Sequence, residues 1–320
     1  MDRNLALEFI RVTEAAAIAA AKWMGRGDGK AADQAAVDEM RDRFNQIDFT
    51  GTVVIGEGEK DKSPKLFTGE KVGKGGGPEM DLAIDPLEAT DSVAFGRMNA
   101  LAVIVAGSKG SLLHAPDTYM DKIMVGKEAA KVIDLDASVA DNVKKVAKAL
   151  GKKVGEVTVV VLDRPRHEQL IKDIRKAGAR VRMITDGDMA AAVAACLPDT
   201  GIDMVMGIGG STEAVLAAAP VKILGGQVLA RFVPRNPEDK KAIEACLRAS
   251  SIKDINYLFD TEALAKGRQL TFTATGVIDG PLLNGVLFTK ETTITQSIVI
   301  RAKSGTIRYI TTHHDACQIC

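Results

Sequence analysis

The sequence predicts an α/β protein with a mixed sheet in its first half and a parallel-rich sheet in its second half. Between residues 157 and 219, short apolar strands alternate with helices, a pattern typical of βαβ units. In the first 106 residues, helical periodicity gives way to short apolar runs, which predict further strands. The chain has 320 residues, of which 46% are hydrophobic, and this length corresponds to about two domains.

The charge balance and the cysteine count narrow the classes of function. Lys and Arg total 42, as do Asp and Glu, so the net charge is zero. This argues against a nucleic-acid binder and against a polybasic membrane anchor. No apolar run is long enough for a transmembrane helix, the charged start is not a signal peptide, and four cysteines are too few for a disulfide scaffold. We therefore expect a cytoplasmic protein that acts on a small molecule, without nucleic-acid or membrane partners.

The elements of the first half follow from changes in periodicity. Apolar residues recur every three or four positions across 2–24 and across 30–47, which predicts two helices. A lysine- and glycine-rich segment at 71–77 is expected to be a surface loop or lid. Short apolar runs predict strands at 52–55, 82–84 and 100–106.

The second half starts after a helix predicted at 138–150. The alternating part contains strands at 157–162, 179–185 and 202–206 and helices at 166–177, 187–197 and 211–219. One more helix is expected at 237–249, where a proline lies in the first turn. We place the domains at 1–150 and 151–320. The Thr-, Val- and Ile-rich segment 270–310 predicts antiparallel strands, which are candidates to return to the first domain.

Asp33 is the first candidate for chemistry. It shares a predicted helix face with four apolar residues, so its carboxylate lies above an apolar stripe: Val37, Met40, Phe44 and Ile47. An unpaired charge in that position is costly. The spacing alone favours another interpretation, an acidic residue at a helix start that the helix dipole stabilises.

Two acidic segments follow the predicted strands. Glu57 and Glu59 flank a glycine directly after strand 52–55, although a solvated turn would explain this motif equally well. The segment 80–92 carries five oxygen-bearing side chains: Asp81, Asp85, Glu88, Thr90 and Asp91. Crowded carboxylates repel one another unless a cation neutralises them, and oxygen ligands select Mg²⁺ or Mn²⁺. This segment, stiffened by Pro86, therefore predicts a site for a hard divalent cation.

Each predicted parallel strand of the second half ends in a polar or glycine-rich loop. These loops lie at 163–167, 186–188 and 207–213, and ligands bind at the carboxyl ends of strands in open α/β sheets. Arg164 and Arg166 offer fork-shaped donors for phosphate oxygens. The three loops are thus expected to form one crevice for a phosphorylated ligand.

The glycine-rich loop favours an anion site at a helix start. Gly209 and Gly210 would let backbone N–H groups approach an anion. Glu213 would repel a phosphate there unless a metal bridges the two. The spacing is not that of a dinucleotide fold, because Thr212 occupies the position of its third glycine, and no Gly-Lys-Ser/Thr of a P-loop follows.

The segment Asp-Pro-Leu-Glu-Ala-Thr at 85–90 resembles the metal motif of the lithium-sensitive sugar and inositol phosphatases. That motif is usually Asp-Pro-x-Asp-Gly-Thr/Ser, so Glu88 and Ala89 are variants. Together with Gly-Glu-Gly-Glu at 56–59 and Gly-Ile-Gly-Gly-Ser-Thr-Glu at 207–213, the chain is similar to class II fructose-1,6-bisphosphatases of the GlpX type over nearly its whole length.

The resemblance implies a layered α-β-α-β-α sandwich, a metal-binding first domain, a substrate-binding second domain and a homo-oligomer, either dimer or tetramer. It implies hydrolysis of the 1-phosphate of fructose 1,6-bisphosphate by a water that Thr90 positions and helps to activate, with Glu57 and Asp85 also catalytic. The implied ligands of two Mn²⁺ or Mg²⁺ ions are Asp33, Glu57, Asp85, Glu88 and Glu213. The implied substrate-binding residues are Glu88, Ala89, Thr90, Tyr119, Arg164, Pro165, Arg166, Asp186, Gly187, Asp188 and Gly210.

Several alternatives stay open. The nearest is a bifunctional enzyme that also hydrolyses sedoheptulose 1,7-bisphosphate, since pocket dimensions decide between the two sugars. An inositol or nucleotide 3′-phosphatase of the same superfamily and a catalytically silent metabolite-binding protein are the others. The pairs His313-His314 and Cys317-x-x-Cys320 have metal-like spacing, but we interpret them as a frayed tail.

Overall fold

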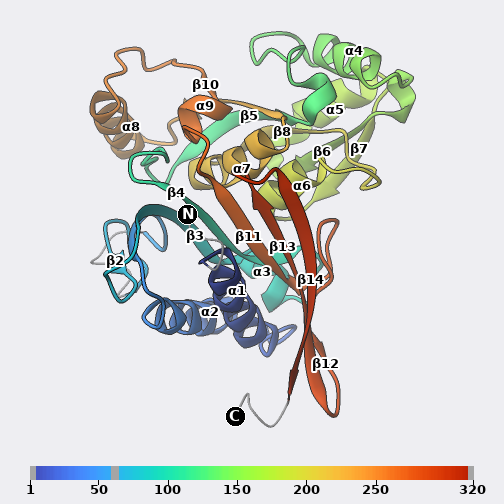
Figure 1. Ribbon diagram of the computed structural model, residues 1–320. Helices are drawn as coiled ribbons and strands as arrows, with labels where there is room; N and C mark the ends of the chain where they lie inside the picture. Colours follow the sequence, from blue (N-terminus) through green and yellow to red (C-terminus); the bar gives the residue numbers. More distant parts are fainter. Residues whose placement is uncertain (1–4, 59–64, 316–320) are drawn as a thin grey trace. The chain divides into compact units, whose positions relative to one another are not determined.

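The computed structural model describes residues 5–58 and 65–315 (Figure 1). The chain divides into two compact units, one made of Met1–Leu112 and Gly267–Cys320 and the other of Leu113–Lys266. The sequence analysis divided the chain at 150 instead. The difference arises because residues 119–125 form a strand of the second sheet, while the strands after 270 pair with β4 of the first unit.

The first unit begins with two helices, α1 (Leu5–Ala21) and α2 (Gly29–Phe44). Both helices were predicted, and both end earlier than predicted. The side chain of Asp28 caps α2 by accepting a hydrogen bond from the Ala31 N–H at 3.0 Å. The helix-start role considered for Asp33 therefore belongs to Asp28.

The first unit contains an eight-stranded mixed sheet in the order β12-β13-β11-β4-β3-β1-β2, with β14 paired to β13. Only β1 and β3 are parallel, and every other neighbouring pair is antiparallel. The strands are β1 (Thr50–Ile55), β2 (Lys71–Val72), β3 (Glu79–Glu88), β4 (Ala100–Ser108), β11 (Thr271–Ile278), β12 (Leu287–Phe288), β13 (Thr292–Arg301) and β14 (Thr306–Asp315). The prediction of a mixed sheet is confirmed.

Three aromatic rings anchor α1 and α2 to this sheet. Phe9 lies edge-on to Phe49, with ring centroids 5.4 Å apart, and edge-on to Phe44 at 6.1 Å. All three rings are fully buried among aliphatic side chains of β1, β3 and β4. Aromatic burial of this kind contributes both apolar area and favourable ring geometry.

The second unit contains a six-stranded sheet in the order β10-β9-β5-β8-β6-β7. The strands are β5 (Tyr119–Val125), β6 (Thr158–Leu162), β7 (Arg180–Ile184), β8 (Met204–Gly210), β9 (Gln227–Val233) and β10 (Phe259–Asp260). The predicted parallel strands are confirmed as β7, β6 and β8. The other half of the sheet is antiparallel, so the expected parallel-rich character holds only for those three strands.

Helices cover both faces of the second sheet (Figure 1). The helices α4 (Val139–Ala149) and α5 (Glu168–Lys176) share a core with alternate residues of β5 and β6. The opposite face carries α6 (Asp188–Ala194) and α7 (Ser211–Ile223), which contact β5, β6, β8 and β9. The remaining helices are α3 (Thr90–Ala94), α8 (Pro237–Ala249) and α9 (Thr261–Leu264), with 3₁₀ turns η1 (Lys127–Ala129), η2 (Val154–Glu156) and η3 (Pro165–His167).

Three local expectations are corrected. The strand predicted at 82–84 continues as β3 to Glu88 through a register shift, so Pro86 does not end it. The segment 71–77 starts with the short strand β2. His313 and His314 are not frayed, because they pair with Ile294 and Thr293 in the ladder of β13 and β14. Cys317 and Cys320 lie outside the described residues.

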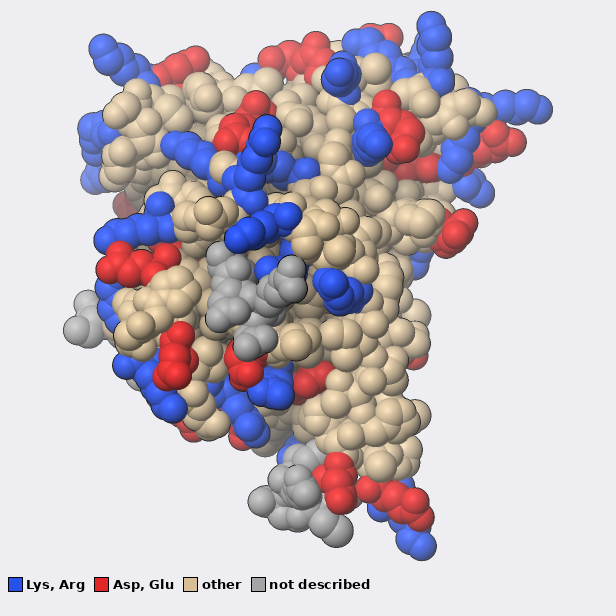
Figure 2. Space-filling view, in the orientation of Figure 1, with Lys and Arg blue, Asp and Glu red and all other residues tan. Residues whose placement is uncertain are grey.

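The surface agrees with the balanced composition. Basic and acidic side chains both occur on the visible faces of the two units (Figure 2). Within residues 5–58 and 65–315, no helix has the length and apolar character needed to cross a membrane.

We predict that Phe9→Ala lowers the free energy of unfolding by about 3–5 kcal/mol, because it opens a cavity between α1, α2 and β1. Leu7→Ala, on the same helix but 51% exposed, is the matched control and is expected to change stability by less than about 1 kcal/mol. Denaturant unfolding measures both values. Equal effects of the two variants would contradict the assignment of Phe9 to the core.

Candidate functional site

Three candidate acidic residues of the first unit lie at or just after the ends of strands: Glu57, Asp85 and Glu88. The parallel strands β1 and β3 pair up to Ile55 and Ala83, so their carboxyl ends reach the same edge of the sheet. Glu57 follows β1 by two residues, and Asp85 and Glu88 lie in the last part of β3. The parallel pairing therefore brings two acidic segments, one after β1 and one at the end of β3, to one edge of the sheet.

Asp33 and Glu57 influence each other electrostatically. Burial raises the pKa of Asp33. Burial, followed by the negative charge of Asp33, raises the pKa of Glu57 to about 8. Both carboxylates are thus disfavoured in their charged form when no cation is close. Oxygen donors with this property fit a hard divalent cation, which would restore the charged forms.

The end of β3 has an irregular backbone. The register with β4 shifts between Asp85 and Glu88, and Pro86, which has no N–H, lies within the shift. Asp85 Oδ1 accepts a hydrogen bond from the Leu87 N–H at 3.1 Å. Glu88 is only 3% exposed, so its carboxylate lies in the protein interior. A strand with this shape presents Asp85 and Glu88 three residues apart at one end.

Thr90 begins α3 directly after a left-handed residue. Ala89 has a φ of 70°, a conformation that L-residues other than glycine adopt at a cost. This explains why the related motif usually has glycine at this position. The Thr90 hydroxyl donates a hydrogen bond to the Leu87 carbonyl at 3.1 Å. Its oxygen lone pairs therefore stay available to accept a hydrogen bond.

The first turn of α2 packs against Thr90. A Cβ added at Gly29 would lie 3.1 Å from Thr90 Cγ2 and 3.6 Å from Ala94 Cβ. The Gly27 N–H also donates to the Ala94 carbonyl at 2.9 Å. These contacts place the helix that carries Asp33 beside the start of α3.

Four of the five metal ligands expected from the sequence lie in the first unit, and Glu213 lies in the second. In the described portion of the chain, no group of three or more His, Cys, Asp or Glu side chains is arranged to hold a metal ion. Asp33 and Glu57 interact electrostatically, and the roles of all five residues as metal ligands stay predictions. Glu59 lies outside the described residues.

A separate cluster in the second unit is built around Tyr119. The antiparallel register places Tyr119 opposite Gly210 of β8 and Val233 of β9. The Arg166 guanidinium lies 4.6 Å from the centre of the Tyr119 ring, and Arg235 lies 4.9 Å from it. Two cations thus stack on one ring, an arrangement suited to an anion with separated charges.

Arg235 was not among the residues predicted from the sequence. Its position next to Tyr119 depends on the antiparallel pairing of β5 and β9, and neither strand was predicted. Asp239 orients the guanidinium, with an Nε–Oδ2 distance of 2.7 Å. This interaction also holds the pKa of Asp239 well below its ordinary value. The available signal was a basic residue directly before Asn236, the N-cap of the predicted helix α8.

His167 connects the arginine loop to β8. Its Nδ1 lies 2.7 Å from the Leu162 carbonyl, and its Nε2 accepts a hydrogen bond from the Ile208 N–H at 2.8 Å. These contacts assign the proton to Nδ1. Burial lowers the pKa of His167, so the ring is held in its neutral form. Arg166 adds a parallel connection by donating to the Ile208 carbonyl at 2.9 Å.

The acidic loop at the end of β7 is also in the second unit. Burial is the largest cause that raises the pKa of Asp186, and the charges of Glu213 and Asp188 add to it. Asp186, Asp188 and Glu213 therefore belong to one acidic neighbourhood. Asp188 forms an ion pair with Lys122, at 2.6 Å between Nζ and Oδ2.

The glycines at the end of β8 leave room for neighbouring side chains. Their predicted role at an anion site stays a prediction, and the packing gives a separate reason for glycine at both positions. A Cβ at Gly210 would collide with the carboxylate of Glu213, and a Cβ at Gly209 would lie 2.7 Å from Lys122 Nζ. Close approach of side chains is therefore the physical reason for these two glycines.

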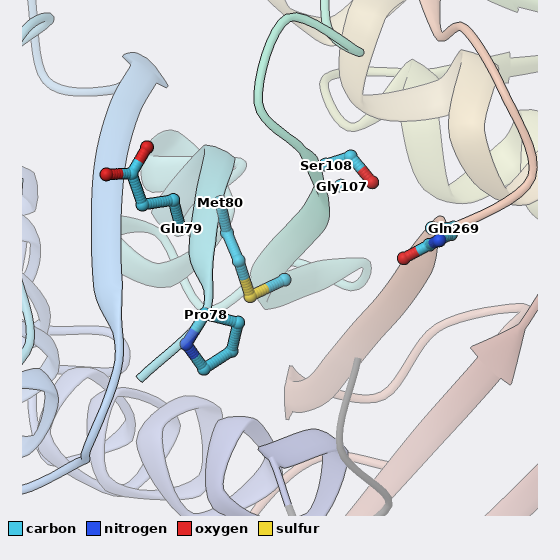
Figure 3. A pocket seen from close by; sticks show the side chains of 6 residues that line it. All are labelled: Pro78, Glu79, Met80, Gly107, Ser108 and Gln269. Atoms are coloured by element: carbon cyan, nitrogen blue, oxygen red, sulfur yellow. The ribbon is translucent and has the colours of Figure 1, made fainter. Parts of the chain in front are cut away.

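A small pocket in the first unit lies away from the candidate metal ligands Asp85 and Glu88. It is lined by Pro78, Glu79, Met80, Gly107, Ser108 and Gln269 (Figure 3). Glu79 and Met80 start β3 and Pro78 directly precedes it, whereas Asp85 and Glu88 lie in the last part of the strand. Five or more residues of strand separate the two, at about 3.3 Å per residue, so the pocket is not part of the acidic site.

We predict that the chelator-treated protein loses stability as the pH rises from about 5 to about 8. Glu57 has a folded-state pKa of about 8, above its ordinary value of 4.5, so the folded state binds the extra proton in that interval. Thermal unfolding as a function of pH measures the slope. Glu57→Gln should reduce it, whereas Glu39→Gln, on an exposed position of α2, should leave it unchanged. Equal slopes in all three proteins would contradict the burial of Glu57.

We predict that Ala89→Gly increases the free energy of unfolding by about 1 kcal/mol, because glycine adopts the left-handed conformation without steric cost. Ala94→Gly, in the helical part of α3, is the matched control and should lose about 1 kcal/mol. Denaturant unfolding compares the two. A loss of stability in Ala89→Gly would show that the alanine is not strained.

Comparisons with known proteins agree with the resemblance. The chain matches the family described as "Bacterial fructose-1,6-bisphosphatase, glpX-encoded" over residues 3–314. Fructose-1,6-bisphosphatase class 2 of Haemophilus influenzae is 45% identical over 324 residues, which cover 98% of this chain and 97% of the relative. Fructose-1,6-bisphosphatase 1 class 2 of Escherichia coli K12 is 44% identical over 322 residues, which cover 98% and 96%.

A solved structure titled as an extragenic suppressor from Pyrococcus furiosus aligns with 59% of this chain and 68% of its own, at 13% identity and a TM-score of 0.31, which is too low to inform the fold. The sequence matches carry the assignment instead, because they span nearly the full length of both chains. The chain belongs to the glpX-encoded family of bacterial fructose-1,6-bisphosphatases.

Proposed function

We propose that the protein hydrolyses the 1-phosphate of fructose 1,6-bisphosphate to give fructose 6-phosphate and phosphate, a reaction of gluconeogenesis. The observation that carries this proposal is the near full-length match to class 2 fructose-1,6-bisphosphatases. The acidic residues of the first unit and the arginine–tyrosine cluster of the second supply the residue types that the reaction needs.

We propose that Asp33, Glu57, Asp85 and Glu88 of the first unit hold Mn²⁺ or Mg²⁺. Glu213 of the second unit is the fifth predicted ligand. The raised pKa values of Asp33 and Glu57 support the assignment, because a cation would offset the cost of charging both groups. When bound, such a cation lowers the pKa of a water molecule and neutralises charge on the phosphoryl oxygens.

Thr90 is proposed to position the attacking water. Its hydroxyl proton is directed to the Leu87 carbonyl, so its oxygen can accept a hydrogen bond from that water. Asp85 and Glu57 remain the other predicted catalytic residues. The left-handed Ala89 turns the chain sharply before α3, which fixes the direction of the Thr90 side chain. Orientation of this kind contributes to rate by restricting the reactants to a productive geometry.

The second-unit residues are proposed to bind the sugar bisphosphate. Arg164, Arg166 and Tyr119 provide charge-assisted and neutral donors for a phosphate group, and Arg235 adds a second guanidinium on the same ring. Pro165 starts η3 and fixes the spacing of the two arginines. Asp186, Gly187, Asp188 and Gly210 are proposed to contact the sugar, and Glu88, Ala89 and Thr90 the phosphate that leaves.

The alternative that stays open is a bifunctional enzyme that also accepts sedoheptulose 1,7-bisphosphate. The homo-oligomer, as a dimer or tetramer, and the cytoplasmic location are likewise proposals. Binding of either Mn²⁺ or Mg²⁺ is part of the same set of predictions.

We predict that purified protein releases phosphate fastest from fructose 1,6-bisphosphate within a panel of sugar, inositol and nucleotide phosphates. A chelator should abolish release, and Mn²⁺ or Mg²⁺ should restore it. Glu57→Ala and Thr90→Ala should each lower kcat at least about a hundredfold. Glu39→Ala is the matched surface control.

The panel also separates the alternatives. Comparable kcat/KM for sedoheptulose 1,7-bisphosphate would establish the bifunctional enzyme, and preference for an inositol or nucleotide phosphate would overturn the proposed substrate. Full activity in chelator, or in Glu57→Ala, would overturn the metal assignment.

A further inference from the structure

Lys122 is a buried lysine in the middle of β5. Its side chain is 1% exposed, although lysine is rarely fully buried unless it is paired. Placing an ammonium group in the interior is costly, so its partners must compensate for the lost hydration. Lys122 is not among the functional residues predicted from the sequence.

The partners of Lys122 are two residues proposed to bind substrate. Its Nζ lies 2.6 Å from Asp188 Oδ2 and donates a hydrogen bond to the Gly210 carbonyl at 3.1 Å. Asp188 is the first residue of α6, and Gly210 is the last residue of β8. One ammonium group thus connects the ends of two elements that are consecutive around the proposed sugar site.

Gly209 provides the space for this connection. A Cβ at Gly209 would lie 2.7 Å from Lys122 Nζ and would also collide with Asp188 Oδ2. The lysine side chain therefore crosses β8 directly over Gly209. Any side chain at that position would push the ion pair apart.

We propose that Lys122 is a positioning residue for substrate binding, which orients the Asp188 carboxylate and the Gly210 carbonyl from beneath the site. The inference rests on the proposed function, because Asp188 and Gly210 matter through their contact with the sugar bisphosphate. Lys122 acts through these two groups, since its 1% exposure prevents direct contact with a ligand. With Oδ2 engaged by Lys122, the other oxygen of Asp188 is fixed in direction toward a sugar hydroxyl.

The test compares Lys122→Met, which keeps the length of the side chain and removes its charge, with Lys172→Met on the exposed side of α5. Steady-state kinetics with fructose 1,6-bisphosphate should show KM raised about tenfold or more in Lys122→Met, with kcat changed by less than about threefold. Lys172→Met should match the wild type. An unchanged KM in folded Lys122→Met would overturn the proposal.

A double-mutant cycle separates positioning from a general structural role. In the Asp188→Asn background, Lys122→Met should lower kcat/KM by less than about threefold, because the carboxylate through which it acts is already gone. Independent, multiplicative losses from the two substitutions would overturn the proposal. Gly209→Ala gives a second test if Lys122→Met does not fold, since the added methyl group displaces the same ion pair and should raise KM similarly.

Hydrogen exchange distinguishes failure of this inference from failure of the proposed function. If the wild type hydrolyses no fructose 1,6-bisphosphate, the proposed function is wrong, and exchange decides the role of Lys122. Amides at 186–190 and 207–211 should then exchange faster in Lys122→Met than in Lys172→Met, while those of β3 stay unchanged. Unchanged exchange in both segments would overturn the positioning role.

Discussion

The parallel pairing of β1 and β3 is the constraint on which the acidic site of the first unit depends. It brings Glu57 and the end of β3 to one edge of a buried sheet, where water cannot fully solvate the carboxylates. The raised pKa values of Asp33 and Glu57 express the resulting cost. The fold thus places several carboxylates where their charged forms are disfavoured. A divalent cation would stabilise those charged forms.

In the second unit, buried and clustered charges are paired with other residues of the same unit. Its acidic neighbourhood of Asp186, Asp188 and Glu213 is balanced in part by the buried Lys122. Arg166 and Arg235 stack on Tyr119 and form hydrogen bonds to Ile208 and Asp239, respectively. His167 stays neutral and contributes only hydrogen bonds, so the strands and turns of this region are joined without additional charge.

Local patterns were sufficient for most of the elements, because helical periodicity and apolar runs report on burial directly. The strands β6 and β7 and the helix α8 were predicted to within one residue, whereas β8 begins two residues later and ends four residues later than predicted. The strand β5 was missed because Asp121 and Lys122 interrupt its apolar pattern, and a charge that is buried through a distant partner leaves no local signal. The same limit hid Arg235, whose position depends on strand pairing, and it left the role of Gly209 to be found from the packing of Lys122.

The discontinuous first unit has a consequence for synthesis of the chain. The sheet neighbour of β4 on one side is β11, which is translated after the whole of the second unit. Until residue 271 emerges from the ribosome, a fully buried, strongly apolar strand has an open edge. The second unit has all its sheet partners by then and can fold first. The nascent chain therefore passes through a stage in which β4 presents an unpaired edge, the kind of surface on which other chains can pair.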